Sequence, residues 1–118
     1  MLVFCRANKD RVTPKKGPEK AIIQAANPDD HVFEVTADSV KISGFTVKDA
    51  SYGIKLYRAN YCNISNNLAL NNRKGVYLHR SSNNMITNNT VNSNKYGISL
   101  WQGSDNNTLV NNVVSSNE

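Results

Sequence analysis

The residues best suited to chemistry recur at an interval of 22 positions in the second half of the chain. One set is aromatic and comprises Tyr57, His79 and Trp101. The positions directly after it hold Arg58, Arg80 and Gln102, and Tyr77 lies beside both sets. Aromatic faces next to fixed hydrogen-bond donors suit a sugar ring, and arginine can hold a carboxylate through two parallel hydrogen bonds. We therefore predict a carbohydrate-binding surface made of Tyr57, Tyr77, His79, Trp101, Arg58 and Arg80. The alternative is that these side chains only cover a strand or contact a neighbouring chain.

The acidic residues do not form a pattern that would support hydrolysis of a glycosidic bond. Such hydrolysis uses two carboxyl groups about 5–9.5 Å apart. After Asp49 the only acids are Asp105 and Glu118, and no two acids are one repeat apart. The dense group Asp29, Asp30 and His31 follows Asn-Pro and is typical of a turn. We therefore predict no catalytic residues.

The same interval organises the elements that must position these side chains. Gly53, Gly75 and Gly97 each begin a stretch of glycine, aliphatic residue, variable residue and leucine. Apolar and polar residues alternate in these stretches, which is the pattern of a half-buried β-strand. Short strands that recur every 22 residues fit a parallel β-helix, in which each repeat makes one coil and like strands stack. The expected inward columns are Ile54-Val76-Ile98, Leu56-Leu78-Leu100, Ile64-Ile86-Leu109 and Val47-Ala69-Val91-Val114.

Asparagine is the most biased residue type in the chain. Of 19 asparagines, 17 lie between Asn60 and Asn117. This bias disfavours helix, because asparagine side chains compete for backbone hydrogen bonds. In a β-helix they would occupy the corners, where stacked amides can hydrogen-bond along the axis. We predict two structural ladders, Asn66-Asn88-Asn111 and Asn72-Asn94-Asn117. A leucine-rich repeat has a similar period but fits poorly, because its leucine positions are not kept from one repeat to the next.

The repeated text G-I/V-x-L…I-x-N-N-x-V…N carries a family resemblance over residues 17–118. It resembles the right-handed parallel β-helix repeats of the NosD-type, carbohydrate-binding-and-hydrolase group in the pectin lyase-like superfamily. The upstream segment GPEKAIIQAANPDDHVFEVTADSVKISGFTV is similar to the first coils of archaeal cell-surface proteins. The resemblance implies an all-β, right-handed parallel β-helix of about five coils, an extracellular or cell-surface location, and polysaccharide on an outer face. Pectinase-like members use clustered carboxylates, sometimes with calcium, which this sequence lacks.

A site for a soft metal such as copper would need Cys, Met and His side chains close together. His31, His79, Cys62 and Met85 are expected on different strips of the coil. Cys5 and Cys62 do not have metal-ligand spacing. We predict neither a metal site nor a cofactor.

The charge distribution separates an N-terminal arm from the body of the protein. The net charge is +5, most of which comes from residues 1–20. We expect residues 1–16 to be a basic arm, disordered or foreign to the fold, and residues 17–118 to be one β-helix domain. Without aromatic interleaving, the basic arm does not indicate a nucleic-acid partner. No apolar run is long enough for a membrane span, and the opening MLVFC is too short for a signal peptide.

The sequence thus leaves three functional hypotheses. The first is a structural or adhesive cell-surface module that binds acidic polysaccharide without catalysis. The second is a lyase, hydrolase or epimerase domain acting on polysaccharide. The third is a spacer without ligand, in which the open ends of the solenoid, whose strand edges are unpaired, associate with other copies of the chain.

Overall fold

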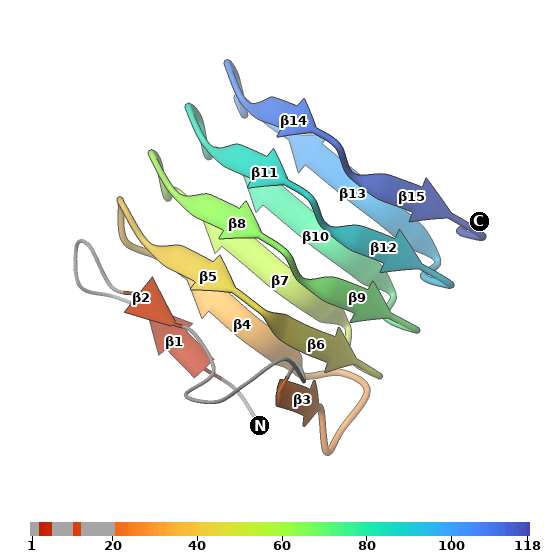
Figure 1. Ribbon diagram of the computed structural model, residues 1–118. Coiled ribbons are helices and arrows are strands. Elements are labelled where there is room, and N and C mark those ends of the chain that lie inside the picture. The colour runs from red at the N-terminus through yellow and green to blue at the C-terminus, as the bar shows by residue number, and fades with distance from the viewer. Residues whose placement is uncertain (1–2, 6–10, 13–20) are drawn as a thin grey trace.

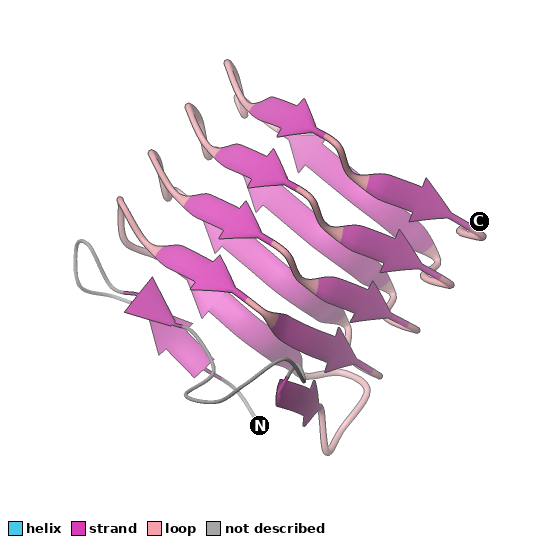
Figure 2. Ribbon diagram, viewed as in Figure 1, coloured by secondary structure: helices cyan, strands magenta, loops and turns pink. Residues whose placement is uncertain are grey.

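The computed structural model describes residues 3–5, 11–12 and 21–118, and all regular elements among them are β-strands (Figure 1). Three strands make one coil, and like strands of successive coils pair in parallel to form three sheets of five strands each. Figure 2 shows the stacked strands with short loops at the corners. The predicted all-β parallel solenoid with a coil of 22 residues is confirmed.

The three sheets are referred to as sheets A, B and C, in the order in which the chain visits them. Sheet A contains β1 (Val3–Cys5), β4 (His31–Val35), β7 (Tyr52–Tyr57), β10 (Lys74–His79) and β13 (Tyr96–Trp101). Sheet B contains β2 (Arg11–Val12), β5 (Lys41–Ser43), β8 (Asn63–Ser65), β11 (Met85–Thr87) and β14 (Thr108–Val110). Sheet C contains β3 (Ala21–Gln24), β6 (Phe45–Lys48), β9 (Leu68–Leu70), β12 (Thr90–Asn92) and β15 (Val113–Ser115).

Most of the predicted N-terminal arm, residues 1–16, lies outside the described residues. Its two described parts, β1 and β2, pair with β4 and β5. The boundary between an arm and the solenoid stays a prediction.

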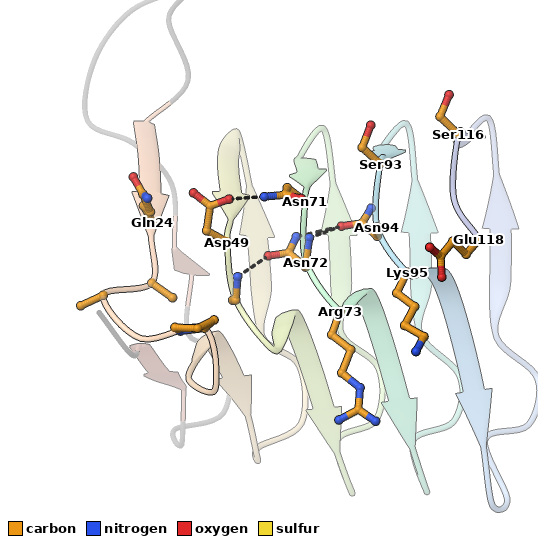
Figure 3. Close-up of a pocket in the computed structure, with 14 residues that line it drawn as sticks. Gln24, Asp49, Asn71, Asn72, Arg73, Ser93, Asn94, Lys95, Ser116 and Glu118 are labelled. Carbon is orange, nitrogen blue, oxygen red and sulfur yellow. Dashed lines mark hydrogen bonds between the residues drawn. The ribbon is translucent and has the colours of Figure 1, made fainter.

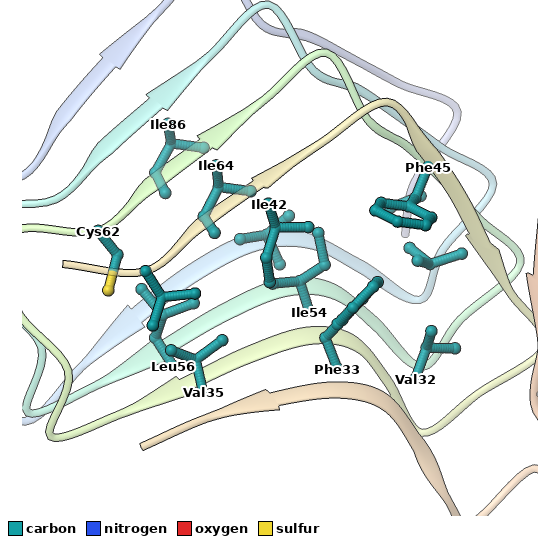
Figure 4. Packing of buried hydrophobic residues seen from close by; sticks show 14 of the residues in the cluster. Val32, Phe33, Val35, Ile42, Phe45, Ile54, Leu56, Cys62, Ile64 and Ile86 are labelled. Atoms are coloured by element: carbon teal, nitrogen blue, oxygen red, sulfur yellow. The ribbon is translucent and has the colours of Figure 1, made fainter. Parts of the chain in front are cut away.

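The core lies between the sheets and is built from aliphatic columns (Figure 4). Strand register confirms the expected columns, since Val76 is paired with Ile54 and Ile98, and Ile86 with Ile64 and Leu109. The side chains of Ile54, Leu78 and Ile86 have no exposed surface. Burial of such side chains contributes about 1.5–3 kcal/mol each, and only stacked coils can achieve it. The columns therefore hold the three sheets together.

Glycine near the start of β7, β10 and β13 is required by close packing between coils. A Cβ atom on Gly75 would lie 2.6 Å from Cγ1 of Val91 and 2.8 Å from the carbonyl oxygen of Gly97. The equivalent atom on Gly53 would lie 2.7 Å from the carbonyl oxygen of Gly75. Such contacts with a neighbouring backbone leave no room for a side chain, which explains the glycine repeat.

The corner between sheets B and C corrects one predicted ladder. Asn66, Asn88 and Asn111 have φ angles of 57°, 54° and 56°, and Asn66 and Asn88 are exposed. Because this left-handed backbone turns the corner, their side chains point away from the interior. The hydrogen-bonded ladder is formed by the next residue of each coil, Asn67, Asn89 and Asn112.

Each buried ladder asparagine satisfies backbone groups of adjacent coils. Asn89 donates from Nδ2 to the carbonyl oxygen of Ile64 (2.8 Å) and to Oδ1 of Asn112 (3.1 Å). Its Oδ1 accepts hydrogen bonds from the backbone N–H and the Nδ2 of Asn67. A second ladder, Asn72-Asn94-Asn117, has the same pattern at the corner between sheets C and A. In a third ladder, Nδ2 of Asn84 donates to Oδ1 of Asn107, and Oδ1 of Asn84 accepts a hydrogen bond from the backbone N–H of Cys62.

The last described coil exposes the apolar side chains that the preceding coils bury. Leu100, Leu109 and Val114 are all exposed, whereas their column partners Leu78, Ile86 and Val91 are buried. Self-association at this end stays a prediction. No helix long and apolar enough to cross a membrane is found in the part of the chain that the structure describes.

We predict that Asn89→Ala lowers the free energy of unfolding by about 2–4 kcal/mol, because it leaves buried backbone and amide groups without partners. The matched control is the neighbouring exposed residue, changed as Asn88→Gly, since glycine tolerates its left-handed φ. The control should change stability by about 1 kcal/mol or less. Urea denaturation followed by circular dichroism measures both, and equal losses would contradict the ladder's role.

Candidate functional site

The outer face of sheet A brings the predicted aromatic set together. Register pairs His79 of β10 with Tyr57 of β7 and Trp101 of β13. The ring centroid of His79 lies 5.3 Å from that of Tyr57 and 5.6 Å from that of Trp101. Trp101 is 56% exposed, so much of its indole is open to solvent. The three rings therefore form one continuous aromatic column across three coils.

The arginine positions border this column at the corner that leaves sheet A. Arg58 and Arg80 are exposed and have φ angles of 52°, which directs both side chains out of the coil. The Arg58 guanidinium carbon lies 5.4 Å from the centre of the Tyr57 ring. Gln102 occupies the equivalent position in the next coil, and its Oε1 lies 2.9 Å from Nε2 of His79. The corner thus supplies hydrogen-bond donors along the edge of the aromatic column.

Tyr77 differs from the prediction, because its ring is covered rather than offered to a ligand. It is only 4% exposed and stacks on Tyr52 at a centroid distance of 5.0 Å and an interplanar angle of 11°. The Lys74 ammonium lies 4.1 Å from the ring centre on this face. Burial raises the pKa of the Tyr77 phenol, with a further contribution from Tyr52. Tyr77 therefore supports its neighbours and does not stack on a sugar in this conformation.

Sequence reasoning missed a second column on the same face. Register aligns His31, Tyr52, Lys74 and Tyr96 on β4, β7, β10 and β13. The signal was available, since Tyr52, Lys74 and Tyr96 each directly precede a repeat glycine at the same interval. It was missed because a lysine interrupts the aromatic series. The outer face of sheet A is therefore wider and more aromatic than predicted.

Lys74 is surrounded by the rings of this face. Its ammonium lies 5.5 Å, 4.1 Å and 5.8 Å from the ring centres of Tyr52, Tyr77 and Tyr96. Cation–π contacts of this kind stabilise the charged amine. Burial, and then the charges of Arg73 and Lys55, nevertheless lower the pKa of Lys74. The amine thus lies among aromatic rings and beside positive charges that form no ion pair in the described ranges.

Positive charge is concentrated on this side of the solenoid. Residues 21–118 contain eight lysines and arginines, and six of them lie on β7 or β10, or directly beside a strand of sheet A. These six are Lys55, Arg58, Arg73, Lys74, Arg80 and Lys95. Within the described ranges the single ion pair joins Lys48 and Asp49 at 3.8 Å and involves none of these six. The outer face of sheet A consequently combines unpaired cations with aromatic rings.

Comparison with known families connects this fold to a named group. Residues 9–118 match the family described as "Periplasmic copper-binding protein (NosD)". The chain belongs to the NosD family. This confirms the NosD-type resemblance over nearly the whole chain, and the family's description refers to the periplasm, outside the cytoplasm. No curated protein matches the NosD-family chain significantly.

A solved structure supports the fold independently of the family match. The crystal structure of an alginate lyase from Paenibacillus sp. str. FPU-7 superposes with a TM-score of 0.80 and 20% sequence identity. The superposition covers 89% of this chain and 42% of the lyase chain. At this identity the likeness shows a shared fold, and the NosD-family chain corresponds to less than half of the lyase's length.

The copper named in the family description does not fit the described residues of this chain. Cys62 is buried, its Sγ lies 3.5 Å from the carbonyl oxygen of Ala37, and burial raises the pKa of its thiol. Met85 is on sheet B, whereas His31 and His79 are on sheet A in separate columns. No group of three His, Cys, Asp or Glu residues that could hold a metal occurs in the described ranges. We therefore derive no copper chemistry for this chain.

We predict that Arg73→Gln raises the pKa of Lys74, because it removes one of the positive charges that oppose protonation. The matched control is Arg58→Gln, which removes an arginine charge from the same face. NMR titration of the Lys74 Nζ resonance measures the change, and an equal response in both variants would contradict the assignment. Because the unfolded chain binds the Lys74 proton more readily, this residue makes stability rise with pH across the interval between its two pKa values.

Proposed function

We propose that this NosD-family chain is a non-catalytic surface module that binds an acidic polysaccharide along the outer face of sheet A. The observation that carries the proposal is the interleaving of unpaired cations and aromatic rings on that face. The positive potential of these cations attracts a polyanion, and the aromatic rings supply flat apolar surfaces for the faces of sugar rings.

Each part of the face has a distinct role in this proposal. Trp101 and Tyr96 are exposed on β13 and offer their rings for stacking against pyranose units. Arg58 and Arg80 hold carboxylates at the corner through charge-assisted hydrogen bonds. Lys74 and Lys55 supply point charges between the rings. Because Trp101 and Tyr96 stand on a paired strand, the stacking surface loses little backbone freedom when ligand binds.

The comparisons support an acidic polysaccharide as the ligand class, although they do not assign a ligand to this chain. Alginate is a polymer of uronic acids, and the lyase that shares this fold is named for it. The family's description places it in the periplasm, a compartment in which a protein can meet such polymers. An adhesive or structural role follows if binding proceeds without turnover, which agrees with the absence of paired carboxylates on β7, β10 and β13.

A second candidate function is cleavage of the polymer by elimination. It is favoured by the lowered pKa of Lys74, whose amine stands on the outer face of sheet A, 4.1 Å from the centre of the Tyr77 ring. A neutral amine could remove the proton on the carbon next to the uronate carboxylate. The glycosidic C–O bond would then break, and its oxygen would take up a proton to leave an unsaturated sugar. Ultraviolet absorbance of the unsaturated product distinguishes this function from binding alone.

We predict that Arg80→Ala and Trp101→Ala each weaken binding of alginate oligosaccharides by about tenfold, through loss of a carboxylate contact or of a stacking surface. Isothermal titration calorimetry at low salt measures the affinities, and rising salt should weaken binding by the wild-type protein.

The matched control for this experiment is Lys41→Ala, which removes a positive charge from β5 on sheet B. It should retain wild-type affinity to within about twofold, because Lys41 is not on the proposed face. Equal weakening by Lys41→Ala and Arg80→Ala would indicate a non-specific charge effect. Absence of binding to alginate and to other acidic polysaccharides would leave a spacer without ligand as the better account.

A further inference from the structure

The corner between sheets C and A carries an open groove that borders the proposed binding face and shares Arg73 and Lys95 with its group of cations (Figure 3). It runs across the coils from Gln24 on β3, in the first coil, to Glu118 beyond the last strand, and its volume is about 880 Å³. This volume lies within the range of about 300–1,000 Å³ that is usual for ligand sites. The groove is parallel to the solenoid axis, because it is lined by equivalent positions of successive coils.

The local backbone explains why a groove forms at this corner. Asp49, Asn71, Ser93 and Ser116 occupy equivalent positions and have φ angles of 59°, 56°, 58° and 54°. This left-handed conformation turns each side chain outward, while the next residue of each coil turns inward. The inward residues include Asn72 and Asn94 of the ladder, which form the floor. One wall of the groove is therefore a regular row of short polar side chains.

The floor and the walls differ in their capacity to bind a ligand. Asn72 is already saturated, since its Nδ2 donates to Val47 and Asn94 and its Oδ1 accepts from the backbone of Ala50. Recognition must therefore come from the walls. Asn71 makes a side-chain hydrogen bond of 2.7 Å to Asp49, whose other carboxylate oxygen lies 3.8 Å from Lys48. The Asp49 charge is thereby partly offset.

The opposite wall supplies cations. Figure 3 shows the side chains of Arg73 and Lys95 extending in parallel on one side of the ladder, with Ser93 and Ser116 on the other. Arg73 and Lys95 occupy equivalent positions of adjacent coils, which places their backbones about 4.8 Å apart. Neither forms an ion pair with another residue in the described ranges. A ligand in the groove thus meets hydroxyl and amide groups and the Asp49 carboxylate on one side, and on the other two cations that form no ion pair in the described ranges, with the Glu118 carboxylate at one end.

We infer that this corner groove is a second binding site for an extended acidic polysaccharide, whose chain lies along the solenoid axis. Its hydroxyl groups exchange hydrogen bonds with the row Asn71, Ser93 and Ser116, and its carboxylates face Arg73 and Lys95. The regular spacing suits a polymer, which presents similar groups at each step, better than a single small molecule. The inference rests on the proposed function for its ligand class, but the location is separate from the aromatic column of sheet A.

The test uses NMR titration of the whole chain with alginate oligosaccharides as the probe. The backbone amides of Asp49 and Ser116 report on the groove, and the indole N–H of Trp101, the single tryptophan, reports on sheet A. We expect both sets of resonances to shift. The variant Asn71→Gly/Ser93→Gly removes two wall side chains without straining the left-handed backbone, and should weaken the groove response by about tenfold while the Trp101 response persists.

The matched control is Asn66→Gly/Asn88→Gly, which removes two exposed side chains with the same backbone conformation from the corner between sheets B and C. It should leave both responses unchanged. The groove site would be overturned if Trp101 responded and the groove did not. It would also be overturned if the two double variants behaved equally, and in both cases the site on sheet A would remain. A groove response without a Trp101 response would support the groove and refute the site on sheet A. Absence of both responses would overturn both.

Discussion

The whole structure depends on satisfying the backbone polar groups at buried corners. A coil of 22 residues must turn three times, and each turn takes N–H and C=O groups out of the regular strand ladders. Ladder asparagines meet this need, since Asn89 alone bonds to groups of the coils before and after it. A buried polar group without a partner costs about 1–3 kcal/mol, and ladder asparagines stand at the corners between sheets B and C and between sheets C and A in the coils that begin with β7, β10 and β13. The asparagine bias of the sequence is the consequence.

This constraint also determines what the surface can display. A residue with left-handed φ precedes each ladder asparagine and points outward, so every corner presents one free side chain per coil. At the corner before sheet A these positions hold Asn71 and Ser93, and the corner after sheet A has two further left-handed residues, Arg58 and Arg80, which precede Ala59 and Ser81. Strand register then aligns the aromatic residues between the two corners. Rows of polar or aromatic side chains along the axis therefore follow from the same repeat that forms the core.

The fold could be predicted from sequence because the repeat appears directly in the spacing of glycines, aliphatic residues and asparagines. The ladder at the corner between sheets B and C was placed one residue too early, since Asn66 and Asn67 are both asparagine and only the backbone shows which one turns inward. Tyr77 was expected to be open because it lies on an outer face. Its burial depends on Lys74 and Tyr52, two long side chains whose directions the sequence pattern does not specify.

The most direct test of this account is a crystal structure of the chain with a bound alginate oligosaccharide. The account predicts sugar rings on the outer face of β7, β10 and β13, with one ring against Trp101 and a carboxylate within hydrogen-bond distance of Arg80. Ligand seated on the outer face of sheet B, or no bound sugar on sheet A at saturating concentration, would contradict it.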